Sequence, residues 1–277
     1  MARGCLYVVG TPIGNLEDIS ARAIRVLREV DLIAAEDTRH TQTLLKHYDL
    51  DTPLTSYHEH NETAKAAELV KELEAGRSIA LVADAGTPGI SDPGYRLVRA
   101  ARARSIPVVS VPGPSAIIAA LAVSGLPTDR FAFHGFVPRK PALFEKLCAA
   151  VLGNGTHVFF ESPRRLKETL RRLRNACPDA QAAVARELTK KFEQVLTGSP
   201  DELLQHVEAN PVRGECVLIV HIGKPRREPP PPPEDLRRRV EQLVEQTGLS
   251  KREAVRVVAE QFRVKRNAVY AAAMRKK

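Results

Sequence analysis

A run of five consecutive prolines, residues 229–233, most constrains how this chain of 277 residues can fold. Proline has no amide hydrogen for a sheet, and its ring clashes with the preceding turn of a helix, so neither element can pass through the run. Consecutive prolines form a stiff, extended spacer. The sequence therefore predicts a linker over residues 224–233 and a separate unit over residues 234–277.

Charge is distributed unevenly about this linker. Residues 1–223 hold 27 Lys/Arg and 26 Asp/Glu, whereas residues 224–277 hold 15 and 7, so the tail carries nearly all of the net charge of +9. Concentrated positive charge favours a polyanionic partner, because neutralising phosphates releases counterions. A solvated helical surface is the alternative, and composition alone does not separate the two.

The tail is expected to be all helical. Its segments 235–248, 249–262 and 264–274 each carry an apolar stripe at helical spacing. Ser250 and Glu253 are spaced as a capping box ahead of the second segment. Three short helices of this kind resemble a helix-turn-helix module.

The body before the linker alternates strand and helix patterns, which is typical of an α/β fold. Ser20, Asn61 and Ser162 are placed as helix caps, the last with Pro163 at the first helical position. We expect two αβα lobes, over residues 1–115 and 116–223, the first with a largely parallel sheet. The expected strands lie at residues 5–9, 31–35, 78–83, 106–111, 131–136, 156–161, 180–187 and 214–223.

Several classes of protein are disfavoured. The four cysteines are scattered, with no Cys-x-x-Cys pair, so neither a disulfide framework nor a structural metal site is expected. No apolar stretch approaches the roughly 18 residues that span a membrane. We therefore expect a soluble protein of the reducing cytoplasm, without a metal and without a membrane partner.

Three turns rich in glycine and proline follow expected strands: Gly10–Gly14, Asp84–Gly94 and Pro112–Ala116. Neither the dinucleotide-binding G-x-G-x-x-G pattern nor a phosphate-binding loop is present. Ligands of α/β sheets bind at the carboxyl ends of strands, where these turns lie. They indicate one groove for an organic ligand that is recognised mainly by backbone groups.

The ordered motifs VGTPIGNLEDI, LIAAEDTRHT, LVADAGTPGISDPGY, VPGPSA, GFVPRK, FFESPRRL and ARELTKKFE resemble the ribosomal RNA small subunit methyltransferase I family across essentially the whole chain. These are class III S-adenosylmethionine enzymes of the tetrapyrrole-methylase type. The resemblance implies a homodimer that methylates the 2′-oxygen of a cytidine in the decoding centre of 16S ribosomal RNA, acting on the 30S subunit. The donor-binding residues that it implies are Pro12, Ala85, Gly86, Thr87, Ile90, Asp92, Ser115, Ala116, Phe160, Glu161, Ser162, Ala185, Arg186 and Glu187.

Methyl transfer to a hydroxyl needs close positioning and benefits from a general base. The candidate bases are Asp92, Glu187, Lys190 and Lys191, the lysines only if burial depresses their pKa. The motif EDTRHT adds Arg39 as a phosphate contact, although Glu36 and Asp37 also suit a solvated helix start.

Further RNA contacts are expected on basic loops and on the tail. With no Trp and 5% aromatic residues, contacts to the RNA backbone should outweigh base stacking. The candidates besides Arg39 are Arg139, Lys140, Arg164, Arg165, Lys251, Arg252, Lys265 and Arg266.

Some features and alternatives stay open. The family's usual Glu-Ser-Pro-His-Arg reads Glu-Ser-Pro-Arg-Arg here, with Arg164 in place of histidine, which argues against a histidine base at that position. His58 and His60 follow another strand end and are read as RNA-facing or surface residues. The competing functions are a class III methylase acting on a small tetrapyrrole-like substrate and a non-catalytic RNA-binding assembly factor.

Overall fold

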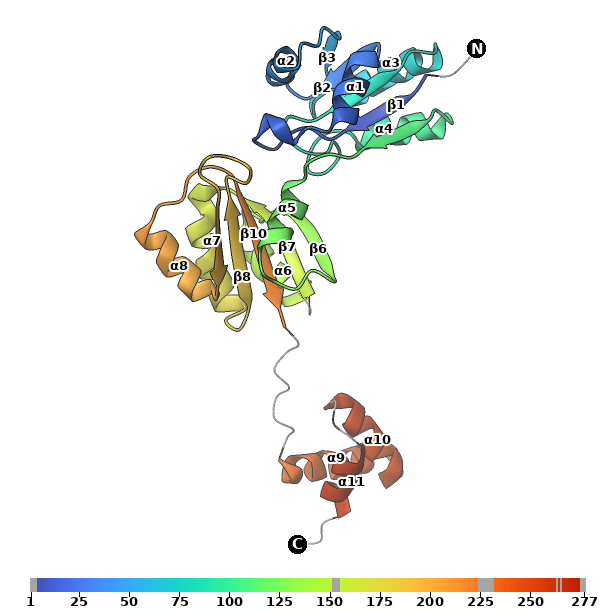
Figure 1. Ribbon diagram of the computed structural model, residues 1–277. Coiled ribbons are helices and arrows are strands. Elements are labelled where there is room, and N and C mark those ends of the chain that lie inside the picture. The colour runs from blue at the N-terminus through green and yellow to red at the C-terminus, as the bar shows by residue number, and fades with distance from the viewer. Residues whose placement is uncertain (1–3, 151–154, 224–231, 263, 265, 275–277) are drawn as a thin grey trace. The chain divides into compact units, whose positions relative to one another are not determined.

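Figure 1 shows the computed structural model, which describes residues 4–150, 155–223, 232–262, 264 and 266–274. The chain forms two compact units, Met1–Ile222 and Gly223–Lys277. The boundary between the two units falls between Ile222 and Gly223, and the expected linker, residues 224–233, stays a prediction, since residues 224–231 of it lie outside the described residues.

The first unit begins with a parallel five-stranded sheet. Its strand order is β3-β2-β4-β1-β5, and each pair of neighbours is parallel, as the sequence predicts for this half of the body. The strands are β1 (Leu6–Val9), β2 (Leu32–Ala35), β3 (Leu54–Ser56), β4 (Ile79–Val82) and β5 (Val108–Val111).

Helices cover both faces of this sheet. On one face α1 (Ala21–Glu29) and α2 (Thr38–His47) contribute to a buried apolar cluster, and on the other face α3 (Glu62–Glu74) and α4 (Tyr95–Ala103) do so. A short 3-10 helix, η1 (Leu16–Asp18), precedes α1. Ser20 caps α1 as expected, accepting a hydrogen bond from the Ala23 amide at 3.1 Å. Asn61 stands at the cap position of α3, but its Oδ1 accepts from the His58 amide instead.

The second sheet is mixed. In its order β6-β7-β10-β8-β9 only β6 and β7 run parallel. Strand β9 is absent from the expected strands, because its apolar residues, Val195 and Leu196, are too few to show alternation. The strands are β6 (Phe131–Phe136), β7 (Gly155–Glu161), β8 (Gln181–Arg186), β9 (Gln194–Gly198) and β10 (Cys216–Ile222).

Three helices cover one face of the second sheet, α6 (Pro141–Ala150), α7 (Pro163–Ala176) and α8 (Pro200–Ala209). Helix α5 (Ala116–Val123) packs on the other face, in a cluster that also includes Ile13 from the turn after β1. The two αβα lobes are therefore confirmed, while a lobe boundary at residues 115 and 116 stays a prediction. Contact through Ile13 brings the first lobe against the second sheet.

The second unit has an apolar core of its own. It contains α9 (Pro233–Thr247), α10 (Lys251–Gln261) and α11 (Arg266–Met274), whose buried side chains include Val240, Val258 and Val269. Ser250 and Glu253 form the expected capping box, with the Glu253 amide donating to Ser250 Oγ at 3.4 Å and the Ser250 amide donating to Glu253 Oε2 at 3.0 Å. Over the part of the chain that the structure describes, no helix is long and apolar enough to cross a membrane.

Candidate active site

The three glycine- and proline-rich turns meet at one edge of the first sheet. Thr11 and Gly86 exchange backbone hydrogen bonds of 2.9 and 3.1 Å, which join the first turn to the second. Gly10 and Gly113 join the first turn to the third, and a Cβ added to Gly10 would lie 2.8 Å from the Gly113 Cα. Glycine is required there because two backbones approach within the space of a side chain.

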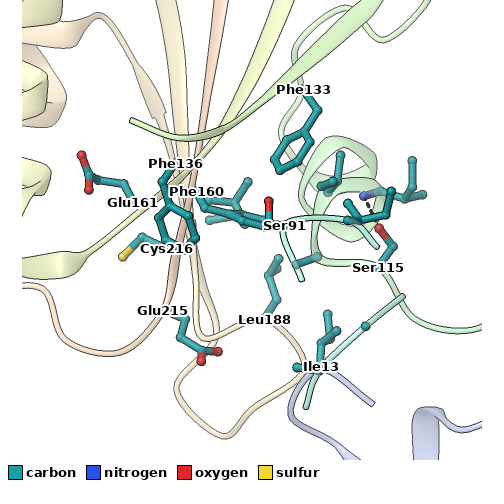
Figure 2. Close-up of a pocket in the computed structure, with 18 of the residues that line it drawn as sticks. Ile13, Ser91, Ser115, Phe133, Phe136, Phe160, Glu161, Leu188, Glu215 and Cys216 are labelled. Atoms are coloured by element: carbon teal, nitrogen blue, oxygen red, sulfur yellow. Dashed lines mark hydrogen bonds between the residues drawn. The ribbon is translucent and has the colours of Figure 1, made fainter. Parts of the chain in front are cut away.

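A cavity of about 760 Å³ opens beside the joined turns. Ile13, Ile117 and Leu188 contribute apolar side chains, and Phe133 and Phe160 pack edge to face with centroids 4.9 Å apart. Figure 2 shows residues of both lobes around this pocket, with Phe133, Phe136 and Phe160 on the second sheet and Ser115 at the start of α5. We call it the large pocket.

A second cavity of about 290 Å³ adjoins the first. The two share Ile13, Ala85 and Glu215 as lining residues. This small pocket is more polar, and its wall from α2 is formed by His40, Thr41, Thr43 and Leu44. The turns thus frame two adjoining cavities, not the single groove that the sequence indicated.

Most of the expected donor-binding residues line the large pocket. Pro12 lines the small pocket instead, and Arg186 and Glu187 are not among the residues that line either one. Ser115 caps α5, its Oγ accepting from the Ile118 amide at 3.5 Å. The residues in the large pocket are Ala85, Gly86, Thr87, Ile90, Asp92, Ser115, Ala116, Phe160, Glu161, Ser162 and Ala185.

The Glu161 carboxylate stabilises the fold and does not face the pocket. Its side chain is fully buried, and it accepts hydrogen bonds from Thr169 Oγ1 at 2.6 Å and from the Ser162 amide at 2.7 Å. Arg165 lies 3.4 Å away as an ion-pair partner. In Figure 2 the carboxylate points away from the phenyl rings. Any contact of this residue with a ligand therefore has to come from its backbone.

Three carboxylates, Glu36, Asp84 and Asp92, gather at the pockets. The Asp84 amide lies 3.5 Å from Glu36 Oε2, and Asp84 Oδ1 accepts from the Asp37 amide at 3.0 Å. Burial, followed by the negative charges of Glu36 and Asp84, raises the pKa of Asp92 to about 6. Burial also raises the pKa of Glu36. Asp92 can therefore gain and lose a proton near neutral pH.

The other candidate bases do not share the raised carboxylate pKa of Asp92. Burial lowers the pKa of Lys190, but the hydrogen bonds and charges of Glu215 and Glu187 outweigh it, and the net pKa is raised. Lys190 Nζ lies 3.0 Å from Glu215 and 3.1 Å from Glu187. The expectation of a lysine base with a depressed pKa is therefore wrong for Lys190. A hydrogen bond from the Glu215 amide lowers the pKa of Glu187, and Lys191 is exposed.

Of the expected RNA contacts in the first unit, Arg39, Arg139, Lys140 and Arg164 are exposed. Arg165 is not free for RNA, because its Nη2 donates to the Val137 carbonyl at 2.6 Å and pairs with Glu161.

In the second unit, Lys251, Arg252 and Arg266 are exposed, and Lys265 lies outside the described residues. On α7 in the first unit, Arg171 forms ion pairs with Glu168 and Glu208, and Arg174 forms one with Asp201, as on a solvated helix face.

The two histidines after β3 lie with ring centroids 6.0 Å apart. His60 is exposed and His58 is half-buried. Among the described residues, no group of three histidine, cysteine or carboxylate side chains could hold a metal ion.

Sequence reasoning missed the aromatic wall of the large pocket. Phe131, Phe133 and Phe136 come from β6, and Phe136 lies 5.5 Å from the Phe160 ring. The alternating aromatic pattern FAFHGF was a signal, but it indicated only a strand. Placement beside the turns depends on how the two lobes pack.

Comparison with known proteins identifies the family. Residues 5–204 match the family of tetrapyrrole (corrin/porphyrin) methylases. Ribosomal RNA small subunit methyltransferase I of Pseudomonas aeruginosa is 50% identical over 224 residues, 79% of each chain. The protein of that name from Synechocystis is 43% identical over 269 residues, 96% of each chain.

Solved structures share the fold. Uroporphyrin-III-C-methyltransferase from Thermus thermophilus aligns with a TM-score of 0.56 at 24% identity, covering 79% of this chain and 94% of that one. Diphthine synthase aligns with a TM-score of 0.59 at 15% identity, covering 79% and 90%. The chain therefore belongs to the ribosomal RNA small subunit methyltransferase I family, and it is an S-adenosylmethionine-dependent methyltransferase with the tetrapyrrole methylase fold.

Proposed function

We propose that this enzyme methylates small-subunit ribosomal RNA, and that the acceptor is the 2′-hydroxyl of a cytidine in the decoding centre. The choice of ribosomal RNA follows the names of relatives that match 79% and 96% of the chain. The 2′-oxygen and the cytidine follow from the resemblance of the ordered motifs. The observation that best supports a transfer reaction is the pair of adjoining pockets, which share a wall at Ile13 and Ala85.

The large pocket fits S-adenosylmethionine. Its volume of about 760 Å³ lies in the range of cavities that enclose small ligands. Aromatic rings offer faces for adenine, and the start of α5 and the Gly86 turn offer backbone polar groups. Of the described residues that line it, Asp92 and Glu215 are acidic besides the buried Glu161, and none is Lys or Arg, which suits a ligand with a positively charged sulfur.

The small pocket is the proposed acceptor site. S-adenosylmethionine supplies a methyl group on a positively charged sulfur, which an oxygen nucleophile can take in line. Because Ile13 and Ala85 border both cavities, an acceptor in the small pocket would meet the donor at their junction. Thr43 and His40 offer polar contacts for a ribose or base, and positioning within about 3 Å supplies much of the rate.

Asp92 is the proposed proton acceptor. Its carboxylate lines the large pocket, and a pKa of about 6 leaves it mostly ionised at neutral pH while keeping it a usable base. The hydroxyl proton would move to Asp92 Oδ as the oxygen takes the methyl group. Asp84 and Glu36 would raise the basicity of Asp92 by their negative charge.

Binding of the RNA is assigned to basic residues on both units. Arg39, Arg139, Lys140 and Arg164 are exposed in the first unit, and the second unit carries most of the excess positive charge of the chain. A small tetrapyrrole-like substrate would leave this unit without a role. We therefore favour an RNA acceptor in the cytoplasm over the small-substrate alternative.

A homodimer is part of the proposal. Ile118, Phe131 and Phe136 line the large pocket yet remain 55%, 44% and 60% exposed. An exposed apolar patch of this kind favours burial against another protein surface, and a second copy of the chain is the occupant that the family resemblance implies. Sedimentation of the wild type as a dimer and of Phe136→Asp as a monomer would support it. A monomeric wild type would refute it.

The decisive experiment is to incubate 30S subunits with the enzyme and tritiated S-adenosylmethionine and to map the methylated ribose. Label in a decoding-centre cytidine 2′-oxygen supports the full proposal, and label at another ribosomal RNA atom supports only its coarser part. Binding to 30S without any transfer would favour the assembly-factor alternative. Asp92→Asn is the matched control, since it should keep binding and transfer the methyl group far more slowly.

A further inference from the structure

Arg39 is the most exposed arginine that forms an ion pair in the described part of the structure, yet it is held in a fixed pose. Its side chain is 89% exposed. Nε donates to Asp37 Oδ1 at 3.1 Å, and Nη2 donates to Asp37 Oδ2 at 2.7 Å. Two parallel contacts of this kind fix the plane of a guanidinium, which a single contact cannot do.

The carboxylate that holds Arg39 is itself fixed. Asp37 is the N-cap of α2, and its Oδ1 accepts from the Arg39 amide at 2.9 Å. These hydrogen bonds from the Arg39 side chain and backbone hold the pKa of Asp37 well below its usual range. The carboxylate therefore stays ionised at any pH at which the enzyme would work. We call Asp37 and Arg39 together the arginine clamp.

The arginine clamp is anchored to the proposed acceptor site. The Asp37 amide donates at 3.0 Å to Oδ1 of Asp84, which lines the small pocket. Arg39 is followed directly by His40 and Thr41, which also line that pocket. The backbone between the pocket wall and the guanidinium is thus one helical turn whose start is tied by hydrogen bonds.

The guanidinium retains unused donors. Asp37 takes Nε and one hydrogen of Nη2, so the N–H groups of Nη1 and the second hydrogen of Nη2 make no hydrogen bond within the described part of the chain. A planar arginine with free donors matches a phosphate group. A fold-stabilising role would not require it to stand in solvent, where an isolated ion pair contributes little.

We propose that Asp37 is a positioning residue that presents Arg39 to a backbone phosphate beside the acceptor ribose, so that the arginine clamp sets the register of the RNA in the small pocket. This inference rests on the proposed function, because it names the part of the RNA that the site grips. The substrate would then have to carry a phosphate beside the acceptor ribose, as an RNA chain does and a nucleoside does not.

Replacement of Asp37 by Asn distinguishes a role of Asp37 in positioning Arg39 from a mere effect of its negative charge on RNA binding. Asparagine caps helices as well as aspartate does, so α2 keeps its start. If Asp37 only adds negative charge near a polyanion, Asp37→Asn should leave RNA binding unchanged or make it tighter. If Asp37 positions Arg39, the same change should raise KM for 30S subunits about three- to tenfold with little change in kcat.

Two further variants complete the test. Glu29→Gln is the matched control, because it removes the same charge from an exposed pair on α1, where Arg25 and Glu29 lie 3.3 Å apart, and it should not raise KM. Arg39→Lys keeps the charge but cannot bridge both carboxylate oxygens, so it should match Asp37→Asn. The double variant should be no worse than either single one, because both remove one interaction.

The result that overturns the inference is an Asp37→Asn enzyme whose KM equals that of Glu29→Gln or of the wild type. Melting temperatures of all variants show whether any loss reflects unfolding. The proposed function is judged separately, from methyl transfer by the wild type. If the wild type fails to transfer but binds RNA, dissociation constants of the same variants decide the inference. If it neither transfers nor binds, both are refuted.

Discussion

Substitution of Gly86 tests whether the turn after β4 binds the methyl donor or only stabilises the fold. Its φ is +82°, a region where a Cβ costs roughly 1–2 kcal/mol. The space itself is open, since an added Cβ would meet Ile13 Cγ2 at 3.6 Å and the Pro114 carbonyl at 3.8 Å, both ordinary contacts. Gly86→Ala should therefore lower the free energy of unfolding by about 1–2 kcal/mol through backbone strain alone.

Gly125 supplies the matched control. Its φ is +69°, an added Cβ would meet nothing within 4 Å, and it does not line the large pocket. Gly125→Ala should lose a similar free energy, and for a unit of this size about 1 kcal/mol lowers the melting temperature by roughly 2–4 °C. The two variants should thus melt alike.

The two variants should differ in their affinity for the methyl donor. Gly86 lines the large pocket, so Gly86→Ala should raise the dissociation constant of S-adenosylhomocysteine about tenfold, equivalent to about 1.4 kcal/mol, and Gly86→Val should raise it further. Calorimetric titration of each variant measures this. Equal donor affinity for Gly86→Ala and Gly125→Ala would refute the assignment of this turn to the donor site, and an unchanged melting temperature would refute the strain argument.

Three other perturbations have defined outcomes. Truncation after Gly223 should leave donor affinity intact, because the second unit has its own core. It should weaken RNA binding and lower the slope of log affinity against log salt concentration by at least about 2. An equal loss of donor binding would contradict this division of roles. Methyl transfer should rise with pH through about 6 as Asp92 ionises, and Asp92→Asn should remove that inflection. Since the folded pKa of Asp92 lies above its usual value, the stability it contributes is present at low pH and is lost as pH rises through about 6, so Asp92→Asn should raise the melting temperature at pH 8 but not at pH 3. Glu161→Ala should cost about 3 kcal/mol in denaturant unfolding, because it leaves the Thr169 hydroxyl and the Arg165 charge without their buried partner; a loss below about 1 kcal/mol would show that water replaces the carboxylate.

Local signals in the sequence were sufficient for much of the fold. Ser20 and Ser250 cap helices as their spacing predicts, because a cap depends only on residues within one turn. The alternation of apolar strands and helical stripes indicated both lobes for the same reason. Strand β9 was not predicted, because an edge strand with few apolar residues has no local pattern to distinguish it from a loop.

Side-chain roles at the site were less predictable. Glu161 and Arg165 belong to motifs that resemble a donor site and an RNA contact, yet their side chains are bonded to each other and to Thr169 or Val137. Lys190 lies close to two carboxylates, which reverses the pKa shift that a base would need. Two of these partners, Val137 for Arg165 and Glu215 for Lys190, lie 28 and 25 residues away in the chain, where no local pattern connects them.

The sequence alone determined that this protein has a proline-bounded basic tail, α/β lobes and three strand-end turns, since each is encoded within a short stretch. Only the tertiary structure decided that the turns frame two pockets and that β6 supplies aromatic rings to one of them. It also showed that Asp92 shares its surroundings with Glu36 and Asp84. The physical reason is that proximity sets both cavity shape and proton affinity, and packing of the two lobes brings together residues that no local pattern connects.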